Sequence, residues 1–124
     1  MGVKGRIMLI DDEPIVCERL KPTLEKVGFE VEAHTDSQKA IDRLAETKFD
    51  VVVTDVKMRG PDGLDILQFV KQHYPSTKVI IITGFATVET ARQAMKSGAV
   101  DFFAKPFKVR QLRDLIISLM KEQT

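Results

Sequence analysis

Short apolar runs alternate five times with amphipathic stretches along the chain, and this alternation constrains the fold more than any other feature. The apolar runs predict strands at residues 6–10, 29–33, 50–54, 78–83 and 101–104. Helical spacing of the apolar residues between them predicts helices at residues 14–26, 37–47, 64–73, 87–96 and 108–121. Strands and helices that alternate through short connections form a parallel sheet with right-handed crossovers and helices on both faces. The predicted fold class is therefore α/β, with a five-stranded parallel sheet.

The composition of each run indicates where its strand lies. Four runs are rich in Val, Ile, Leu or Phe and hardly alternate, which is typical of strands buried on both faces. The run at 29–33, Phe-Glu-Val-Glu-Ala, does alternate, so it predicts an edge strand with one wet face. For five such units we expect the flavodoxin-like strand order 2-1-3-4-5. Ser37 and Thr87 stand where helix N-caps belong.

Size and charge exclude several classes of protein. The 124 residues predict one domain, 1–124. The net charge of 19 − 18 = +1 gives no basic field for binding nucleic acid. No apolar stretch approaches the roughly 20 residues that cross a bilayer, and no signal peptide opens the chain, so we expect a cytoplasmic protein without a membrane partner. A single cysteine excludes an internal disulfide, and the apolar neighbours of Cys17 predict a buried thiol.

Polar residues stand where the central apolar runs stop, and parallel strands would bring them to one edge of the sheet. These residues are Asp11 and Asp12 after the first run, Asp55 after the third, Thr83 after the fourth and Lys105 after the fifth. Ligands of open α/β sheets bind beyond the carboxyl ends of the strands, where the strand order reverses. In the order 2-1-3-4-5 that reversal lies between strands one and three. Asp11, Asp12 and Asp55 are therefore predicted to share one crevice.

Three carboxylates in one crevice predict a divalent cation. At about 4 Å and an effective dielectric constant near 20, a pair of like charges costs on the order of 4 kcal/mol. Mg²⁺ relieves this repulsion, because it prefers hard oxygen ligands and leaves positions for phosphate oxygens. Asp55 can then act as a nucleophile that forms an acyl phosphate. Lys105 and the Thr83 hydroxyl would be drawn toward the added negative charge.

Each of these residues also has a simpler interpretation. Asp11 to Pro14 suits the start of a helix, Asp55 and Thr83 could cap loops, and a lysine such as Lys105 is most often a surface charge. Only the joint placement at strand ends favours a site. A haloacid-dehalogenase-like enzyme needs a second acid two residues after its nucleophile, where this chain has Lys57. A flavodoxin needs a phosphate loop after the first strand, and the acidic segment there would repel phosphate.

Five segments, taken together, resemble the receiver domain of two-component response regulators. They are Leu-Ile-Asp-Asp-Glu at 9–13, Val-Thr-Asp-Val-Lys-Met at 53–58, Asp-Gly-Leu at 62–64, Ile-Ile-Thr-Gly at 81–84 and Phe-Ala-Lys-Pro-Phe at 103–107. The spacings also fit the family: 55 − 12 = 43, 83 − 55 = 28 and 105 − 83 = 22. The stretch 83–99 looks most like receivers of the nitrogen-regulator kind, which head enhancer-binding activators of transcription.

The resemblance implies roles for particular residues. Asp55 resembles the phosphoacceptor, and Asp11, Asp12, Asp55 and the backbone carbonyl of Lys57 resemble the magnesium ligands of the family. Lys105 resembles the lysine that pairs with the phosphoryl group.

The same resemblance implies the parts of the switch. Thr83 resembles the switch hydroxyl and Phe102 the switch aromatic, although an aromatic on the last strand is most often a core residue. The Lys105–Pro106 bond is expected to be cis. One departure is visible, because the family usually has Met-Pro-Gly after the phosphoacceptor and this chain has Met-Arg-Gly-Pro at 58–61.

The implied function is a phosphorylation-activated signalling switch. A sensor histidine kinase is the expected partner, and the surface of residues 87–96, 101–104 and 108–121 is expected to control an output domain or downstream protein, or to form a homodimer. The domain itself would bind no nucleic acid. It would not be an enzyme beyond self-catalysed phosphoryl acceptance and slow acyl-phosphate hydrolysis. The alternative is a receiver-like protein-interaction module that works without phosphorylation.

Overall fold

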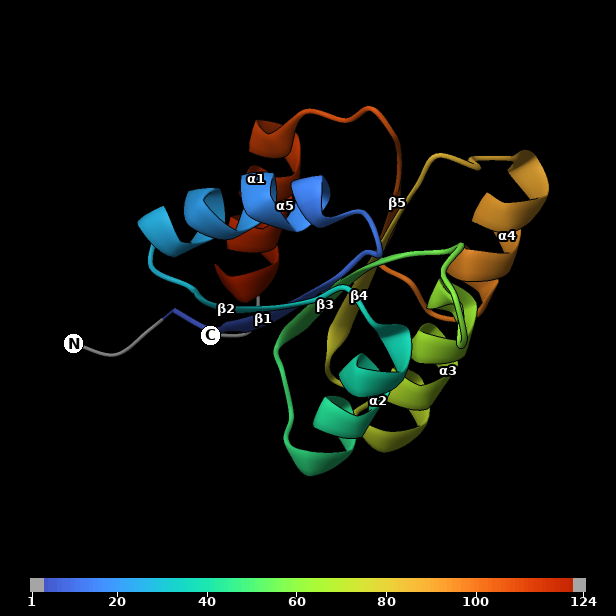
Figure 1. Cartoon of the computed structure of the whole chain (residues 1–124). Helices are drawn as coiled ribbons and strands as arrows, with labels where there is room; N and C mark the ends of the chain where they lie inside the picture. Colours follow the sequence, from blue (N-terminus) through green and yellow to red (C-terminus); the bar gives the residue numbers. More distant parts are fainter. Residues whose placement is uncertain (1–3, 122–124) are drawn as a thin grey trace.

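The computed structural model describes residues 4–121, which form five strands and five helices in strict alternation (Figure 1). The strands are β1 (Arg6–Ile10), β2 (Glu30–His34), β3 (Val51–Asp55), β4 (Lys78–Thr83) and β5 (Asp101–Ala104). The helices are α1 (Pro14–Lys26), α2 (Ser37–Glu46), α3 (Gly63–His73), α4 (Val88–Lys96) and α5 (Val109–Lys121). None of the helices within this range is long and apolar enough to cross a membrane.

The strands form one parallel sheet in the order β2-β1-β3-β4-β5, so the predicted fold class, strand order and edge position of the second strand are confirmed. The register brings the carboxyl ends of the central strands to one edge. Ile10 lies opposite Thr54, Asp55 opposite Ile82, and Thr83 opposite Ala104. The residues that follow these ends are therefore neighbours in space.

The predicted boundaries differ from the observed ones by single residues. Asp55 belongs to β3, because it still pairs with Ile82 in the ladder with β4. The prediction that Thr87 caps α4 is confirmed, since its hydroxyl accepts from the Thr90 amide at 3.1 Å. The prediction that Ser37 caps α2 is wrong. Asp36 is the cap there, and its carboxylate accepts from the amides of Gln38 and Lys39, leaving the Ser37 hydroxyl for another partner.

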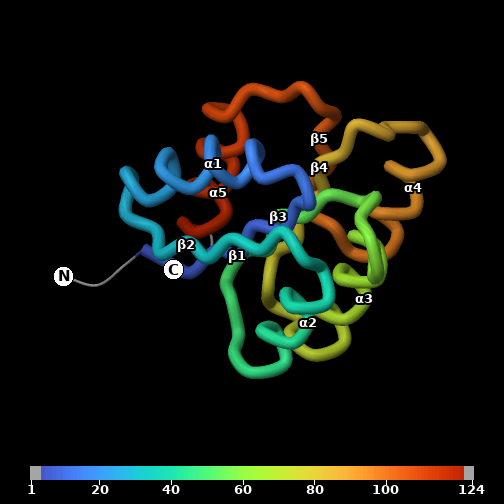
Figure 2. The backbone as a smooth tube through the Cα atoms, in the orientation of Figure 1, coloured from blue at the N-terminus to red at the C-terminus, as the bar shows by residue number. Residues whose placement is uncertain are grey.

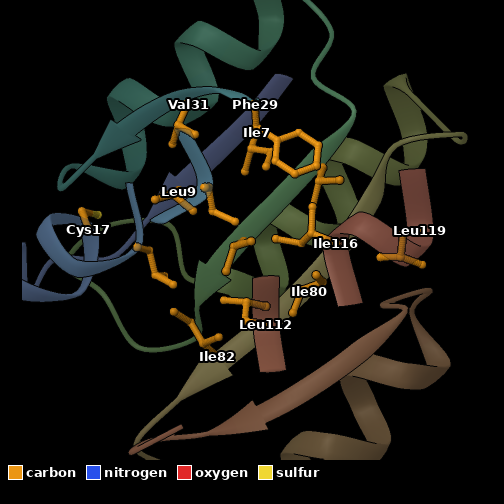
Figure 3. Close-up of a cluster of buried hydrophobic side chains, with 14 residues drawn as sticks. Ile7, Leu9, Cys17, Phe29, Val31, Ile80, Ile82, Leu112, Ile116 and Leu119 are labelled. Atoms are coloured by element: carbon orange, nitrogen blue, oxygen red, sulfur yellow. The ribbon is translucent and has the colours of Figure 1, made fainter. Parts of the chain in front are cut away.

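Two apolar clusters sandwich the sheet. One joins the sheet to α1 and α5 and includes Leu20, Leu112 and Ile116. Figure 3 shows Leu112 and Ile116 beside the strand residues Ile80 and Ile82. The other joins the opposite face to α2, α3 and α4 (Figure 1). Cys17 lies in the first cluster, as predicted, and burial together with the nearby charge of Asp11 raises the pKa of its thiol to about 11.

Candidate functional site

Three carboxylates meet at the carboxyl edge of the sheet, as the sequence predicted. Asp11 follows β1 and is 1% exposed, Asp55 ends β3 and is 5% exposed, and Asp12 is open to solvent. Each offers one oxygen that lies within 4.8 Å of the other two. Two oxygens bound to one Mg²⁺ are at most about 4.2 Å apart. Only a small closure of these side chains would therefore bring three oxygens within reach of one Mg²⁺ ion.

Lys105 crosses the site from the end of β5 and contacts the acidic residues directly. Its Nζ lies 2.7 Å from Asp11 Oδ2, 2.8 Å from Glu13 Oε1 and 3.0 Å from Asp55 Oδ2. Burial alone would lower the pKa of Lys105, but these carboxylates outweigh it and raise the pKa well above the ordinary value. Lys105 is therefore a permanent cation. Sequence reasoning assigned no role to Glu13, although its position beside the Asp11-Asp12 pair was a usable signal.

Asp11 shows that the cluster fits a hard cation. Its Oδ1 accepts from the Glu13 amide at 2.9 Å. Its Oδ2 is buried and has no aligned hydrogen-bond donor among residues 4–121, although the Lys105 ammonium is close. Burial raises the pKa of Asp11, and the neighbouring charge of Asp55 adds to the effect. An oxygen that is short of donors, among four carboxylates and one ammonium, suits Mg²⁺.

Asp55 is held by its own backbone neighbours. Its Oδ1 accepts from the Val56 amide at 2.7 Å, and its Oδ2 accepts from Lys105. The chain returns close beside it, because the Gly63 amide donates to the Val56 carbonyl at 2.8 Å. A Cβ at position 63 would overlap the Asp55 carbonyl oxygen, so only glycine allows α3 to begin so near the site.

Thr83 and Lys105 are connected through the backbone. The Lys105 amide donates to the Thr83 carbonyl at 2.8 Å, and Lys105–Pro106 is cis, as expected. The Thr83 side chain is fully buried, and its hydroxyl accepts from the Phe85 amide at 3.0 Å. The Thr83 hydroxyl thus lies at the same edge of the sheet as Asp55 and bonds to the connection that leads into α4. Its role as a switch stays a prediction.

Lys57 and Phe85 form a contact that sequence reasoning did not predict. The Lys57 Nζ lies 4.5 Å from the centroid of the Phe85 ring, which is 58% exposed. This is a cation–π distance, and it joins the loop after Asp55 to the loop after Thr83. The Lys57 carbonyl as a metal ligand stays a prediction.

Phe102 and Phe103 point to opposite sides of the sheet. Phe102 is half-buried and packs against the cluster that includes α4, whereas Phe103 packs against the cluster of α1 and α5. Phe102 thus lies on the α4 side of the sheet, and its role as the switch aromatic stays a prediction.

The sequence pattern described as "Response regulator receiver domain" matches residues 7–117. The chain belongs to the response regulator receiver family. Receiver domains are signalling switches rather than enzymes, and Asp11, Asp12, Asp55 and Lys105 lie together at one edge of the sheet in this receiver.

Two similar proteins have names that refer to response or transcriptional regulators. The receiver is 34% identical to "Response regulator protein PilR" of Pseudomonas aeruginosa over 95% of its own length and 26% of PilR. It is 38% identical to "Transcriptional regulatory protein FixJ" of Bradyrhizobium diazoefficiens over 98% of its length and 60% of FixJ. The chain thus spans from about a quarter to 60% of these two relatives.

A solved structure, the beryllofluoride-activated NtrC4 receiver domain dimer, superposes with a TM-score of 0.88 at 34% identity, covering 96% of this chain and 98% of that one. The resemblance to receivers of the nitrogen-regulator kind is confirmed.

Proposed function

We propose that this receiver accepts a phosphoryl group on Asp55 in a Mg²⁺-dependent reaction and thereby changes its α4-β5-α5 surface. The observation that carries the proposal is that Asp55 shares Lys105 with Asp11 and Glu13 within hydrogen-bonding distance. Asp11, Asp12, Asp55 and the Lys57 carbonyl would hold the metal, which when bound neutralises the oxygens of the transferring phosphoryl group.

The transfer step needs little from the chain beyond positioning. A carboxylate oxygen of Asp55 forms a bond to phosphorus as the bond from phosphorus to the donor's nitrogen or oxygen breaks, and the donor leaves with that electron pair. Lys105 then exchanges its contact with Asp55 for a phosphoryl oxygen. Its remaining contacts with Asp11 and Glu13 keep the ammonium at the site.

The acyl phosphate would act as a ligand that favours one of two pre-existing states. The Thr83 hydroxyl would leave the Phe85 amide for a phosphoryl oxygen, and Phe102 would turn inward into the vacated space. Both residues lie against α4 or its entry, so the α4-β5-α5 surface is the one that changes.

A sensor histidine kinase is the proposed phosphoryl donor, an output domain or downstream protein is the proposed target, and transcription regulation is the proposed output. An apolar hollow of about 400 Å³ opens beside Lys105, between α1 and the start of α5, and offers a contact surface for the kinase. A homodimer is supported by the dimeric state of the beryllofluoride-activated NtrC4 receiver, and the α4-β5-α5 surface is the interface proposed for it here. The alternative is an interaction module that works without phosphorylation.

Mass spectrometry after incubation with acetyl phosphate and Mg²⁺ tests the proposal. We expect the mass of one phosphoryl group on the wild type and none on Asp55→Asn. Asp50→Asn is the matched control, because Asp50 precedes β3 at the opposite end of the sheet and should leave phosphorylation intact. A mass gain that persists in Asp55→Asn would refute the nucleophile. No gain in the wild type, from acetyl phosphate or from a panel of kinases, would favour the phosphorylation-independent module.

A further inference from the structure

The hydroxyl of Ser37 makes a long-range bond that its position in the sequence does not explain. Ser37 is the first residue of α2 and is 2% exposed. Its Oγ donates to the backbone carbonyl of Arg59 at 2.8 Å, across 22 residues of chain. Because Asp36 already caps α2, the serine is not needed for capping. A buried hydroxyl that bonds a loop carbonyl acts as a brace between α2 and that loop.

The braced loop, residues 56–62, leaves Asp55 and has no regular secondary structure. Its ends are closed by the bond from the Gly63 amide to the Val56 carbonyl. Its middle is largely open to solvent, and Gly60 there has φ +77, a left-handed conformation that glycine adopts easily. The bond from Ser37 holds the residue just before this turn, in the segment where the proline is displaced from the family pattern.

We propose that Ser37 is a positioning residue for the metal site. This rests on the proposed function, because the metal-binding carbonyl assigned to Lys57 lies two residues before Arg59. With Arg59 held, the loop between the end of β3 and the brace has few conformations, and the Lys57 carbonyl is preorganised toward the carboxylates. Without the brace the loop samples further conformations. The apparent affinity for Mg²⁺ then falls in proportion to the fraction of molecules whose loop is still in the binding-competent conformation.

The chain supplies a matched control for a purely structural role. Thr77 is another fully buried hydroxyl, and its Oγ1 donates to the Phe49 carbonyl at 2.5 Å. It precedes β4, at the end of the sheet opposite to Asp55. Thr77→Val therefore removes a bond of the same kind without touching the loop at 56–62.

Calorimetric titration with MgCl₂ alone separates the two roles, at a temperature where circular dichroism shows every variant folded. We expect Ser37→Ala to bind Mg²⁺ about fivefold more weakly, the size of one lost hydrogen bond, and Thr77→Val to keep the wild-type affinity while its melting temperature falls. Ser37→Cys retains the volume and a weak donor, so it should fall between wild type and Ser37→Ala, and it replaces the alanine variant if that one does not fold.

Two results would overturn the inference. Wild-type Mg²⁺ affinity in the Ser37 variants would show that the brace is only structural and would leave the proposed metal site intact. An equal loss in Thr77→Val would show that affinity follows global stability. If the wild type itself binds no Mg²⁺, the metal site and the inference fall together, and this outcome is distinct from the first two.

Discussion

Helices α3 and α4 cover the same face of the sheet, yet they are attached to it very differently. Helix α3 buries Gly63, Ile66, Leu67 and Val70, whereas α4 buries only Ala94 among its own residues. The longer apolar side chains of α4 face solvent, with Val88 76% and Met95 47% exposed. Figure 2 shows α4 at the outer side of the molecule, beyond α3.

The difference separates a fixed part of the receiver from a movable one. Each fully buried aliphatic side chain contributes about 1.5–3 kcal/mol through its removal from water. Moving α3 would forfeit several such contributions, while moving α4 would forfeit little more than one methyl group. Helix α3 begins shortly after Asp55, and helix α4 begins shortly after Thr83. The proposed phosphorylation of Asp55 can therefore leave α3 in place and shift α4.

The largest expected effect is in α3. Leu67 is fully buried, so Leu67→Ala should lower the free energy of unfolding by about 2–5 kcal/mol through lost burial and the cavity left behind. Urea unfolding followed by circular dichroism measures it. A loss below about 1 kcal/mol would mean that α3 is no more firmly attached than α4.

The second largest expected effect is a difference in local opening between α3 and α4. Because α4 has one buried side chain, its amides are expected to exchange with solvent at least about tenfold faster than those of α3. Hydrogen exchange followed by NMR measures both helices in one sample. Adding Mg²⁺ and beryllofluoride should change protection in α4 and leave α3 unaltered, and equal changes in the two helices would break the comparison.

The polar contact that attaches α2 to β2 should contribute less to the stability of the fold than buried apolar side chains do. Glu32 of β2 accepts from Arg43 of α2 at 2.8 Å and lies 2.9 Å from His34. Burial alone would raise the pKa of Glu32, but hydrogen bonds from Arg43 and His34 outweigh it and lower the pKa. A depressed pKa contributes stability above the ordinary value near 4.5, and this stability is lost as the pH falls through the folded-state pKa.

Glu32→Gln should therefore lower the melting temperature slightly at pH 7, and the difference from wild type should shrink below pH 4.5. Thermal unfolding across this pH range measures it. Glu30→Gln is the control, because the exposed Glu30 carboxylate lies 3.9 Å from the Arg6 guanidinium and makes only a loose ion pair. A difference that grows in acid would contradict the assignment.

The smallest effect is expected in α4. Met95→Ala removes a side chain of about the size of Leu67 from a position that is 47% exposed, so the free energy of unfolding should change by no more than about 0.5 kcal/mol. The same urea titration applies. A loss comparable with that of Leu67→Ala would show that α4 is anchored by its outer face, which the structure does not suggest.

The sequence predicted the convergence of Asp11, Asp12, Asp55 and Lys105, because strand ends in a parallel sheet share an edge. The strand order was expected from the precedent of flavodoxin-like sheets with five such units. It could not predict contacts that depend on how loops fold back. Ser37 had the right residue type for a cap, and only the placement of Asp36 shows that its hydroxyl turns to Arg59 instead. The contact between Lys57 and Phe85 likewise joins two loops whose approach no periodicity encodes.

The bond between the Thr83 hydroxyl and the Phe85 amide carries a mechanical consequence. Rotation about a single side-chain torsion of Thr83 would withdraw the oxygen from this amide. The first turn of α4 starts at Val88, three residues farther on. One torsion angle in the interior is thus coupled to the start of a surface helix through a connection of only a few residues.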